Sequence, residues 1–475
     1  MKVPLIKDHA GLYTDYYELA MAQAYYLQGK ADDEAVFDYF FRKNPFNGGY
    51  VLFSGINELL ETLEELQFSQ QELDYLRQIG FGDNFLDYLS RFSFTATIKA
   101  PREGEVVFPI EPLLTVKGKI IELQIIETML LNLLNFSSLV STKASRIRSA
   151  AGDRLFTDFG LRRAQGAGGI TASRAAIVGG ANSTSNVISG FLYELPVSGT
   201  MAHSWIQTFD DELTAFRKFA ECYPENTILL LDTYNTINSG IPNAIKVAKE
   251  MEERGERMKG IRLDSGDLAY LSKQARKMLD RAGLEYVKII VSNQLDEAVI
   301  RSLNLQKAPI DGFGIGTKLI TGMESAAIDG VYKLSGFNGQ PRMKISDNIE
   351  KTTLPGEKRT VRYLNHDGTF HGDGILLESE LETKEIIHPY FNFKRTDVET
   401  LNQENITRKV MENGKRLSNG KSAKESAEYA RERLSKLPEE HHRLEYPHHF
   451  KVGISQKLAK MRDNMLENIN KKEEL

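Results

Sequence analysis

The sequence predicts an α/β protein built around a parallel β-sheet, mainly because of the pattern in residues 153–319. Short apolar runs alternate there with amphipathic stretches of helical spacing: "RLFTDFGLRRAQG" precedes "ITASRAAIVGG", and "TILLLDTYNT" precedes "IPNAIKVAKEMEERG". Strands that alternate with helices form parallel sheets with right-handed crossovers. The series is long enough to favour a barrel, with an open, doubly wound sheet as the alternative.

The length and composition bound the class of protein. A chain of 475 residues is too long for one ordinary compact core, so we expect at least two domains, or a barrel with an added domain. Hydrophobic residues make up 41% and charged residues 26%, which is typical of globular proteins and argues against disorder. A net charge of −5 argues against binding of nucleic acid.

Cysteine usage and hydropathy indicate the compartment. The single cysteine, Cys222, excludes an intrachain disulfide and a cysteine-based zinc site. The first residues contain no apolar signal core, and no apolar run approaches the length of a membrane span. We therefore expect a cytoplasmic protein that binds neither membrane nor nucleic acid.

The flanking regions mix helix and strand signals. Before the alternating series we expect a helix over 14–28, strands over 34–43 and 49–55, turn-linked strands over 94–120, and a long helix to 151. Lys143 and Arg146 are expected on the solvated face of that helix. Beyond about residue 350 we expect a hairpin over 360–377 with an Asp-Gly turn, and exposed helices over 421–437 and 455–475.

Polar residues follow nearly every apolar run of the alternating series. The runs end in "DFGLRR", "GTMAH", "LDTYNT", "RLDSGDL", "SNQ" and "GIGT". In an α/β barrel the carboxyl ends of the strands converge on one face, which holds the active site. A purely structural protein does not need Arg, Asp, His and Asn at successive strand ends, so the pattern predicts an enzyme.

Two of these motifs suit a phosphorylated sugar. In "GFGIGT", Gly314, Gly316 and Thr317 let backbone N–H groups approach an anion, although a tight turn is the simpler interpretation. In "GIRLDSGDL", Arg262 suits a carboxylate or phosphate, and Asp264 suits ribose hydroxyls or magnesium. The alternative for these two residues is a structural ion pair. Asp267 is expected to cap the next helix.

The remaining candidates point to a flat anion and a reactive imidazole. Asp232 follows a buried run, where a carboxylate is costly unless paired or ligated. Phe159 beside Arg162 suits a flat anionic ring, with core packing of Phe159 as the alternative. His203, in a segment that reads as a strand end (194–205), is a core histidine, a ligand or a reactive group. The late histidines of "HHRLEYPHH" are expected in an exposed, irregular segment.

Several long motifs together resemble one family. "TDYYELAMA", "DFGLRRAQG", "SGTMAHSW", "LLLDTYNT", "GIRLDSGDL", "VSNQLDE" and "GFGIGTKL" occur in the order found in nicotinate phosphoribosyltransferases, from residue 11 to at least 336. The resemblance implies an irregular (β/α) barrel with a second α/β domain built from N-terminal and C-terminal segments. We expect these parts over 1–135, 136–350 and 351–475.

The family's reaction joins nicotinate to phosphoribosyl pyrophosphate (PRPP), giving nicotinate mononucleotide and pyrophosphate in NAD salvage, coupled to ATP hydrolysis. The resemblance makes His203 the histidine that ATP phosphorylates; a neutral imidazole is a competent nucleophile. It implies catalytic roles for His203, Asp264 and Arg262, and magnesium as cofactor without direct protein ligands. The implied nicotinate-binding residues are Tyr17, Phe159, Arg162, Thr200 and Arg262, and the implied PRPP- or phosphate-binding residues are Asp232, Asn293, Gly314, Gly316 and Thr317.

The resemblance also implies a homodimer with shared active sites, because Tyr17 stacks on the pyridine ring of the partner subunit's site. Nicotinamide and quinolinate phosphoribosyltransferases share the barrel, and ring preference depends on few contacts. A catalytically inactive nucleotide sensor is the alternative from another functional class. The presence of His203, Arg262, Asp264 and Thr317 argues against it.

Overall fold

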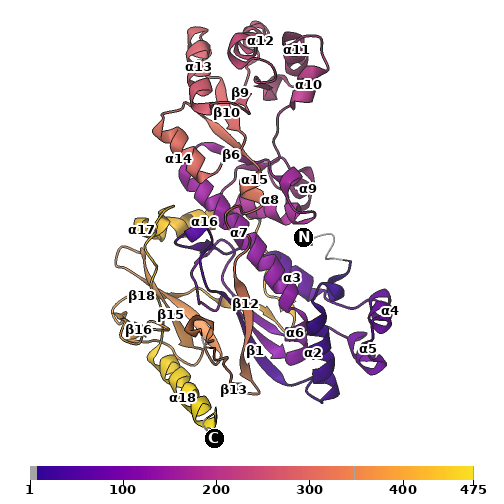
Figure 1. Cartoon of the computed structure of the whole chain (residues 1–475), viewed down its shortest axis with the longest axis vertical. Helices are drawn as coiled ribbons and strands as arrows, with labels where there is room; N and C mark the ends of the chain where they lie inside the picture. Colours follow the sequence, from indigo (N-terminus) through magenta and orange to yellow (C-terminus); the bar gives the residue numbers. More distant parts are fainter. Residues whose placement is uncertain (1–7, 347, 474–475) are drawn as a thin grey trace. The chain divides into compact units, whose positions relative to one another are not determined.

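The computed structural model describes residues 8–346 and 348–473, which form two compact units. Unit 1 combines residues 1–142 with 324–475, and unit 2 comprises residues 143–323. Unit 1 is therefore built from both ends of the chain. Figure 1 labels many of the helices and strands of the two units.

Unit 2 contains a six-stranded parallel sheet in the order β7-β6-β11-β10-β9-β8. The strand core is apolar, as expected for a parallel sheet covered on both faces: Phe156, Leu229, Ile261, Val291 and Phe313 are almost fully buried. The strands are β6 (Leu155–Asp158), β7 (Ser183–Thr184), β8 (Ile228–Leu230), β9 (Gly260–Leu263), β10 (Lys288–Ser292) and β11 (Gly312–Ile315).

Helices follow the strands in the predicted alternation. Asp267 caps α13 by accepting from the Tyr270 N–H at 3.0 Å, as expected from the sequence. α13 packs on β9 and β10, and α11 packs on α12. The helices of unit 2 are α8 (Gly168–Val178), α9 (Val187–Tyr193), α10 (His203–Gln207), α11 (Glu212–Cys222), α12 (Ile241–Glu253), α13 (Leu268–Arg281), α14 (Glu297–Leu305) and α15 (Thr317–Ile320).

The structure supports the predicted barrel only in part. The α/β class and the parallel sheet are confirmed, but within residues 8–346 and 348–473 no hydrogen-bonded ladder joins β7 to β8 and closes the sheet. The strand expected over 194–205 is wrong. That stretch contains only a single bridge, from Val197 to Thr184, because the chain there leaves the sheet before α10 begins at His203.

The expectation that Lys143 and Arg146 lie on a solvated face is also wrong. Both side chains belong to α7 (Glu127–Ala151) and are buried, with exposures of 0% and 7%. Lys143 Nζ lies 2.9 Å from Glu297 Oε2, and Arg146 Nε lies 2.8 Å from Glu297 Oε1. Buried charges of this kind require such pairing, which no local sequence pattern reveals.

Unit 1 contains a seven-stranded sheet and a six-stranded sheet. The first has the order β13-β12-β1-β5-β3-β19-β20, and the second β17-β16-β21-β15-β14-β18; a short pair, β2-β4, stands apart. The N-terminal strands are β1 (Glu34–Phe41), β2 (Val51–Leu52), β3 (Thr97–Ala100), β4 (Val106–Val107) and β5 (Leu114–Lys119). The C-terminal strands are β12 (Gly330–Phe337), β13 (Gln340–Pro341), β14 (Lys358–Leu364), β15 (Phe370–Leu377), β16 (Glu385–Ile387), β17 (Arg395–Asp397), β18 (Asn402–Asn405), β19 (Arg408–Glu412), β20 (Lys415–Arg416) and β21 (Val452–Ile454).

The seven-stranded sheet interleaves both ends of the chain, because β1 pairs with β12 and β3 pairs with β19. Its apolar residues share one core with the N-terminal helices, including Phe37, Leu59, Leu130 and Tyr332. Ser69 and Ser422 begin α4 and α16 with capping boxes. The helices are α2 (Tyr16–Leu27), α3 (Ile56–Glu64), α4 (Gln70–Gln78), α5 (Asp83–Leu89), α6 (Ile120–Ile125), the first part of α7, α16 (Ala423–Lys436), α17 (Glu439–His442) and α18 (Gln456–Glu473).

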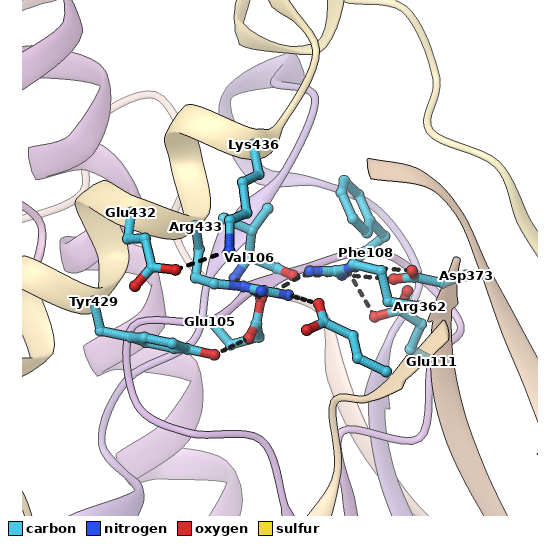
Figure 2. A network of polar contacts seen from close by, with 11 residues as sticks. Glu105, Val106, Phe108, Glu111, Arg362, Asp373, Tyr429, Glu432, Arg433 and Lys436 are labelled. Atoms are coloured by element: carbon cyan, nitrogen blue, oxygen red, sulfur yellow. Dashed lines mark hydrogen bonds and ion pairs between the residues drawn. The ribbon is translucent and has the colours of Figure 1, made fainter. Parts of the chain in front are cut away.

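A buried network of charges joins the two ends of the chain within unit 1 (Figure 2). The fully buried Arg362 guanidinium donates to both Asp373 oxygens, at 2.9 and 2.6 Å, and to Glu105 Oε1 at 2.7 Å. Glu105 Oε1 also accepts from Arg433 of α16 at 2.8 Å. Removing one member of such a pair leaves an uncompensated buried charge, at a cost of about 3–5 kcal/mol.

The prediction of an exposed, irregular segment is confirmed for His448 and His449, which are exposed and lie outside any helix or strand, and is wrong for His441. His441 belongs to α17, is 6% exposed, and its Nδ1 lies 2.7 Å from the His448 carbonyl oxygen. His442 Nε2 lies 2.8 Å from the Leu437 carbonyl oxygen. The imidazoles therefore fix the backbone of this turn.

Among the residues that the structure describes, no helix has the length and hydropathy needed to cross a membrane.

Candidate active site

The candidate site lies at the carboxyl edge of the parallel sheet in unit 2. Phe159, Asp232, Asp264, Asn293 and Gly316 each follow a strand, namely β6, β8, β9, β10 and β11, by one or two residues. These five strands are neighbours in the sheet and run parallel, so the polar residues at their ends share one edge. The sequence pattern of apolar run and polar end therefore converges in space.

Arg262 is the centre of this constellation. Its side chain is 11% exposed, and each guanidinium nitrogen has a partner. Nε donates to Ser292 Oγ at 2.8 Å, Nη1 to Thr200 Oγ1 at 2.9 Å, and Nη2 to Asp264 Oδ1 at 2.9 Å. The structural ion pair considered for Arg262 and Asp264 thus exists, and it fixes a planar cation at the sheet edge.

Two carboxylates are held side by side next to Arg262. Asp232 Oδ2 accepts from the Asp264 N–H at 3.0 Å and from the Ser265 hydroxyl. Asp264 Oδ1 accepts from Arg262 and from the Ser292 hydroxyl. Asp232 Oδ1 is buried and has no hydrogen-bond partner among residues 8–346 and 348–473. A buried carboxylate oxygen without a donor is costly, so this atom is suited to a ligand hydroxyl or a cation.

His203 is the first residue of α10 and is 40% exposed, which excludes a core histidine. Its Nδ1 lies 3.0 Å from Oγ1 of Thr233, the residue that directly follows Asp232 in the chain. Its Nε2 lies 3.9 Å from Asp264 Oδ2. Nδ1 is therefore held by the Thr233 hydroxyl, while Nε2 faces the Asp264 carboxylate, which is paired with Arg262.

Phe159 supplies a flat apolar surface beside the guanidinium, which lies 5.3 Å from the ring centroid. The glycines of "GFGIGT" make room for this residue. A Cβ at Gly314 would lie 2.3 Å from Phe159 Cε2, and a Cβ at Gly316 would lie 3.1 Å from the Phe159 carbonyl oxygen. Close packing against Phe159 is therefore one physical reason for these glycines.

Asp158, which the sequence analysis did not select, fixes the end of β6. Its fully buried carboxylate accepts from the Gly160 N–H at 2.8 Å, the Ser173 hydroxyl at 2.8 Å and the Thr184 hydroxyl at 2.7 Å. Burial raises the pKa of Asp158. The carboxylate ties the turn after Phe159 to α8 and β7. Ser292, Thr233 and Ser265 were also missed, since an isolated hydroxyl residue is no chemical signal in a sequence.

The other predicted residues are less closely tied to the cluster. Arg162 is exposed and makes no hydrogen bond or ion pair with any residue in the described ranges. Asn293 is exposed and has φ of 109°, a strained conformation for a non-glycine residue. Thr317 begins the short helix α15. Tyr17 lies on α2 of unit 1, 47% exposed, where burial, Glu127 and Glu18 raise its pKa.

Comparison with known proteins decides the family. A profile described as "Nicotinate phosphoribosyltransferase (NAPRTase) family" matches residues 155–378, with N-terminal and C-terminal domain profiles of the same enzyme at 12–135 and 357–462. The nicotinate phosphoribosyltransferase of Bacillus subtilis is 40% identical over 460 residues, covering 94% of each chain. The chain belongs to the nicotinate phosphoribosyltransferase family. It is therefore a transferase enzyme, and the predicted family and nicotinate phosphoribosyltransferase activity are confirmed.

A relative and a solved structure with lower sequence identity carry the same enzyme name. The human nicotinate phosphoribosyltransferase is 33% identical over 510 residues, covering 94% of this chain and 95% of its own. The crystal structure of human nicotinic acid phosphoribosyltransferase superposes with a TM-score of 0.86 and 31% identity, covering 95% of this chain and 99% of that chain. The similarity thus includes both units of this nicotinate phosphoribosyltransferase family member.

Proposed function

We propose that the strand-end cluster of unit 2 joins nicotinate and PRPP into nicotinate mononucleotide and pyrophosphate. The pyridine nitrogen attacks the anomeric carbon of the ribose, the bond from that carbon to pyrophosphate breaks, and pyrophosphate leaves with the electron pair. The pyridine nitrogen of nicotinate carries no proton at neutral pH, so no general base is needed. The observation that carries the proposal is Arg262, fixed at the sheet edge beside Phe159, Asp264 and Thr200.

Nicotinate would lie against the Phe159 ring, with its carboxylate directed to cationic and hydroxyl donors. Arg262 and Thr200 are already hydrogen-bonded to one another at 2.9 Å, and Arg162 is the exposed cation closest to Phe159 in the chain. A charge-assisted contact favours the acid over the neutral amide. Tyr17 would close the other face of the ring from a second subunit, so the functional assembly is a homodimer with shared sites.

PRPP would bind along the same edge. Asp232 has a free, buried carboxylate oxygen suited to a ribose hydroxyl. Gly314, Gly316, Thr317 and Asn293 would hold the phosphates through backbone N–H groups and short polar side chains. As charge develops on the ribose and on pyrophosphate, Asp264 and Arg262 would stabilise the cationic and the anionic end.

The carboxylates at this edge fit magnesium as a cofactor. Among residues 8–346 and 348–473 no cluster of three or more His, Cys, Asp or Glu side chains forms a protein-only metal site. Asp232 and Asp264 are nevertheless adjacent, and magnesium commonly binds through one or two carboxylates plus substrate phosphates. When bound, the ion would neutralise charge on pyrophosphate.

ATP would act through His203. With Nδ1–H donating to Thr233 Oγ1, the lone pair of Nε2 is free to attack the terminal phosphorus of ATP. The P–N bond forms as the bond to ADP breaks, and later hydrolysis returns the imidazole. The phosphoryl group would stand beside Asp264 and Arg262, where it orders the substrate and drives the synthesis forward.

We also propose the domain arrangement that the family resemblance implies. The open sheet of unit 2 would form part of an irregular barrel over 136–350, with 1–135 and 351–475 building the second domain. The protein would act in the cytoplasm, in NAD salvage.

The proposal is tested by pyrophosphate release with PRPP, magnesium and ATP, comparing nicotinate, nicotinamide and quinolinate. Turnover with nicotinate alone is expected. Turnover with another ring would change the proposed role of Arg262 and Thr200 in selecting the acid. Binding without turnover of any ring would make the protein a nucleotide sensor and refute the proposed reaction.

A further inference from the structure

A cavity in unit 1 is lined by cations that the proposed reaction does not use. Its volume is about 290 Å³, near the lower end of the range for small-molecule sites. Its apolar wall comes from α3 and β19, with Ile56, Leu60 and Val410. Its charged wall contains four cations and one carboxylate: Arg102, Arg408, Arg416, Lys421 and Glu103.

Two of the four cations are already paired. Arg416 Nε lies 2.7 Å from Glu64 Oε2, and Lys421 Nζ lies 2.9 Å from Glu425 Oε1. Arg102 and Arg408 differ from them, because neither forms an ion pair with a carboxylate in the described part of the chain. The cavity therefore faces two guanidinium groups without an ion-pair partner in the described ranges, of which Arg102 also lies near enough to Glu432 to help lower the pKa of that carboxyl.

The carboxylate in the cavity wall is fully engaged. Glu103 is 3% exposed and accepts from the Asn57 amide at 2.7 Å, the Gly55 N–H at 3.0 Å and the hydroxyls of Ser54 and Ser426 at 3.2 and 3.1 Å. These donors occupy both oxygens of the Glu103 carboxylate. They also tie α3 to α16, which makes the wall rigid.

The two free guanidiniums are positioned by the fold. Arg408 pairs with Ala100 across β19 and β3, and Arg102 follows Ala100 by two residues, so both belong to the same corner of the sheet. Arg102 stacks on the Tyr429 ring, with its guanidinium carbon 4.2 Å from the centroid. The Tyr429 hydroxyl donates to Glu105 of the buried network in Figure 2. A stacked guanidinium loses less entropy on binding an anion.

We propose that this cavity binds the phosphate group of a small metabolite, at a site separate from the strand-end residues of unit 2. Two forked guanidiniums without an ion-pair partner in the described ranges suit a dianion better than a single carboxylate. The apolar wall leaves room for an organic portion next to that group. Free inorganic phosphate and a phosphate ester share this chemistry.

Hydrogen–deuterium exchange of the full chain tests the proposal, because it locates binding along the sequence. Inorganic phosphate, AMP and adenosine are titrated separately. Phosphate or AMP is expected to slow exchange in peptides covering 98–104 and 416–422, independently of peptides covering 199–205 and 312–318. A lower half-saturating concentration for AMP identifies a phosphate ester as the ligand class, and equal values identify free phosphate.

Arg408→Ala is expected to raise the half-saturating concentration for residues 98–104 about tenfold, the change expected for loss of one charge-assisted hydrogen bond. Lys409→Ala is the matched control, since Lys409 is the next residue of the same strand and does not line the cavity. Equal protection in Arg408→Ala and the parent, protection by adenosine as strong as by AMP, or no protection of these peptides would each overturn the proposal. Failure of the proposed transferase reaction would instead appear when pyrophosphate release is compared for nicotinate, nicotinamide and quinolinate.

Discussion

Replacement of Asp158 by alanine tests whether the carboxylate at the end of β6 positions Phe159 and its turn. In the parent, this buried carboxylate accepts three hydrogen bonds of 2.7–2.8 Å, from Gly160, Ser173 and Thr184. Asp158→Ala removes both acceptor oxygens, and with them all three hydrogen bonds, from a fully buried site. The turn that carries Phe159 then loses its connection to α8 and β7.

The size of the effect follows from the partners that remain. Ser173 retains an alternative acceptor, the Gly169 carbonyl oxygen at 3.1 Å, and the Thr184 hydroxyl still accepts from the Asn186 N–H at 3.0 Å. In the described part of the chain, the Gly160 N–H and the Thr184 hydroxyl donate only to Asp158. A buried donor left unsatisfied costs about 1–3 kcal/mol. Because only the Ser173 hydroxyl has another acceptor, two donors are left unsatisfied, and we expect the free energy of unfolding of unit 2 to fall by about 2–6 kcal/mol.

Urea unfolding monitored by tryptophan fluorescence measures this change, since Trp205 is the single tryptophan and lies in unit 2. kcat/KM for nicotinate is measured in parallel and should fall, because the ring surface of Phe159 is displaced. Asp153→Ala, an exposed carboxylate just before β6, is the control and should change neither quantity. An Asp158→Ala protein with the parent's midpoint and kcat/KM would refute the positioning role.

Three further predictions concern packing, charge and pH. Gly314→Ala places a Cβ 2.3 Å from Phe159, so we expect a lower melting temperature and a raised KM for nicotinate; unchanged values would mean that the ring moves freely. Arg262→Ala should lower kcat/KM for nicotinate at least 100-fold while the far-ultraviolet circular dichroism spectrum stays that of a folded protein; wholesale unfolding would make the residue purely structural. Glu111→Gln tests linkage: burial, with the neighbouring Asp373 carboxylate, raises the pKa of Glu111 well above 4.5. The stabilising contribution of Glu111 is therefore fully present below pH 4.5, its usual pKa, and is lost as the pH rises through the raised pKa. The difference in unfolding free energy between parent and Glu111→Gln should therefore fall with rising pH; a constant difference would contradict the shift.

The sequence predicted the parts of the fold that depend on local periodicity. The alternation of apolar runs and amphipathic helices identified β6, β8, β9, β10 and β11 with the helices between them. It also placed the polar residues at the strand ends, which parallel pairing then brings to one edge.

Long-range pairing and support by hydroxyl groups could not be predicted in this way. Lys143 reads as a surface residue, yet a partner 154 positions away, Glu297, makes its burial possible. Asp158 and Ser292 hold the site by accepting or donating hydrogen bonds, a role that many Asp and Ser residues have elsewhere. The closure of the sheet depends on strand stagger and tilt, which the hydrophobic pattern does not encode.

The proposed phosphorylation of His203 is the central chemical claim, and it is tested most directly by incubating the protein with ATP labelled in its terminal phosphate. We expect acid-labile label on the peptide containing His203, and a His203→Ala variant that loses ATP hydrolysis but keeps weak transfer from PRPP. A His203→Ala protein that hydrolyses ATP at the parent's rate, with no label on the parent's His203, would contradict it.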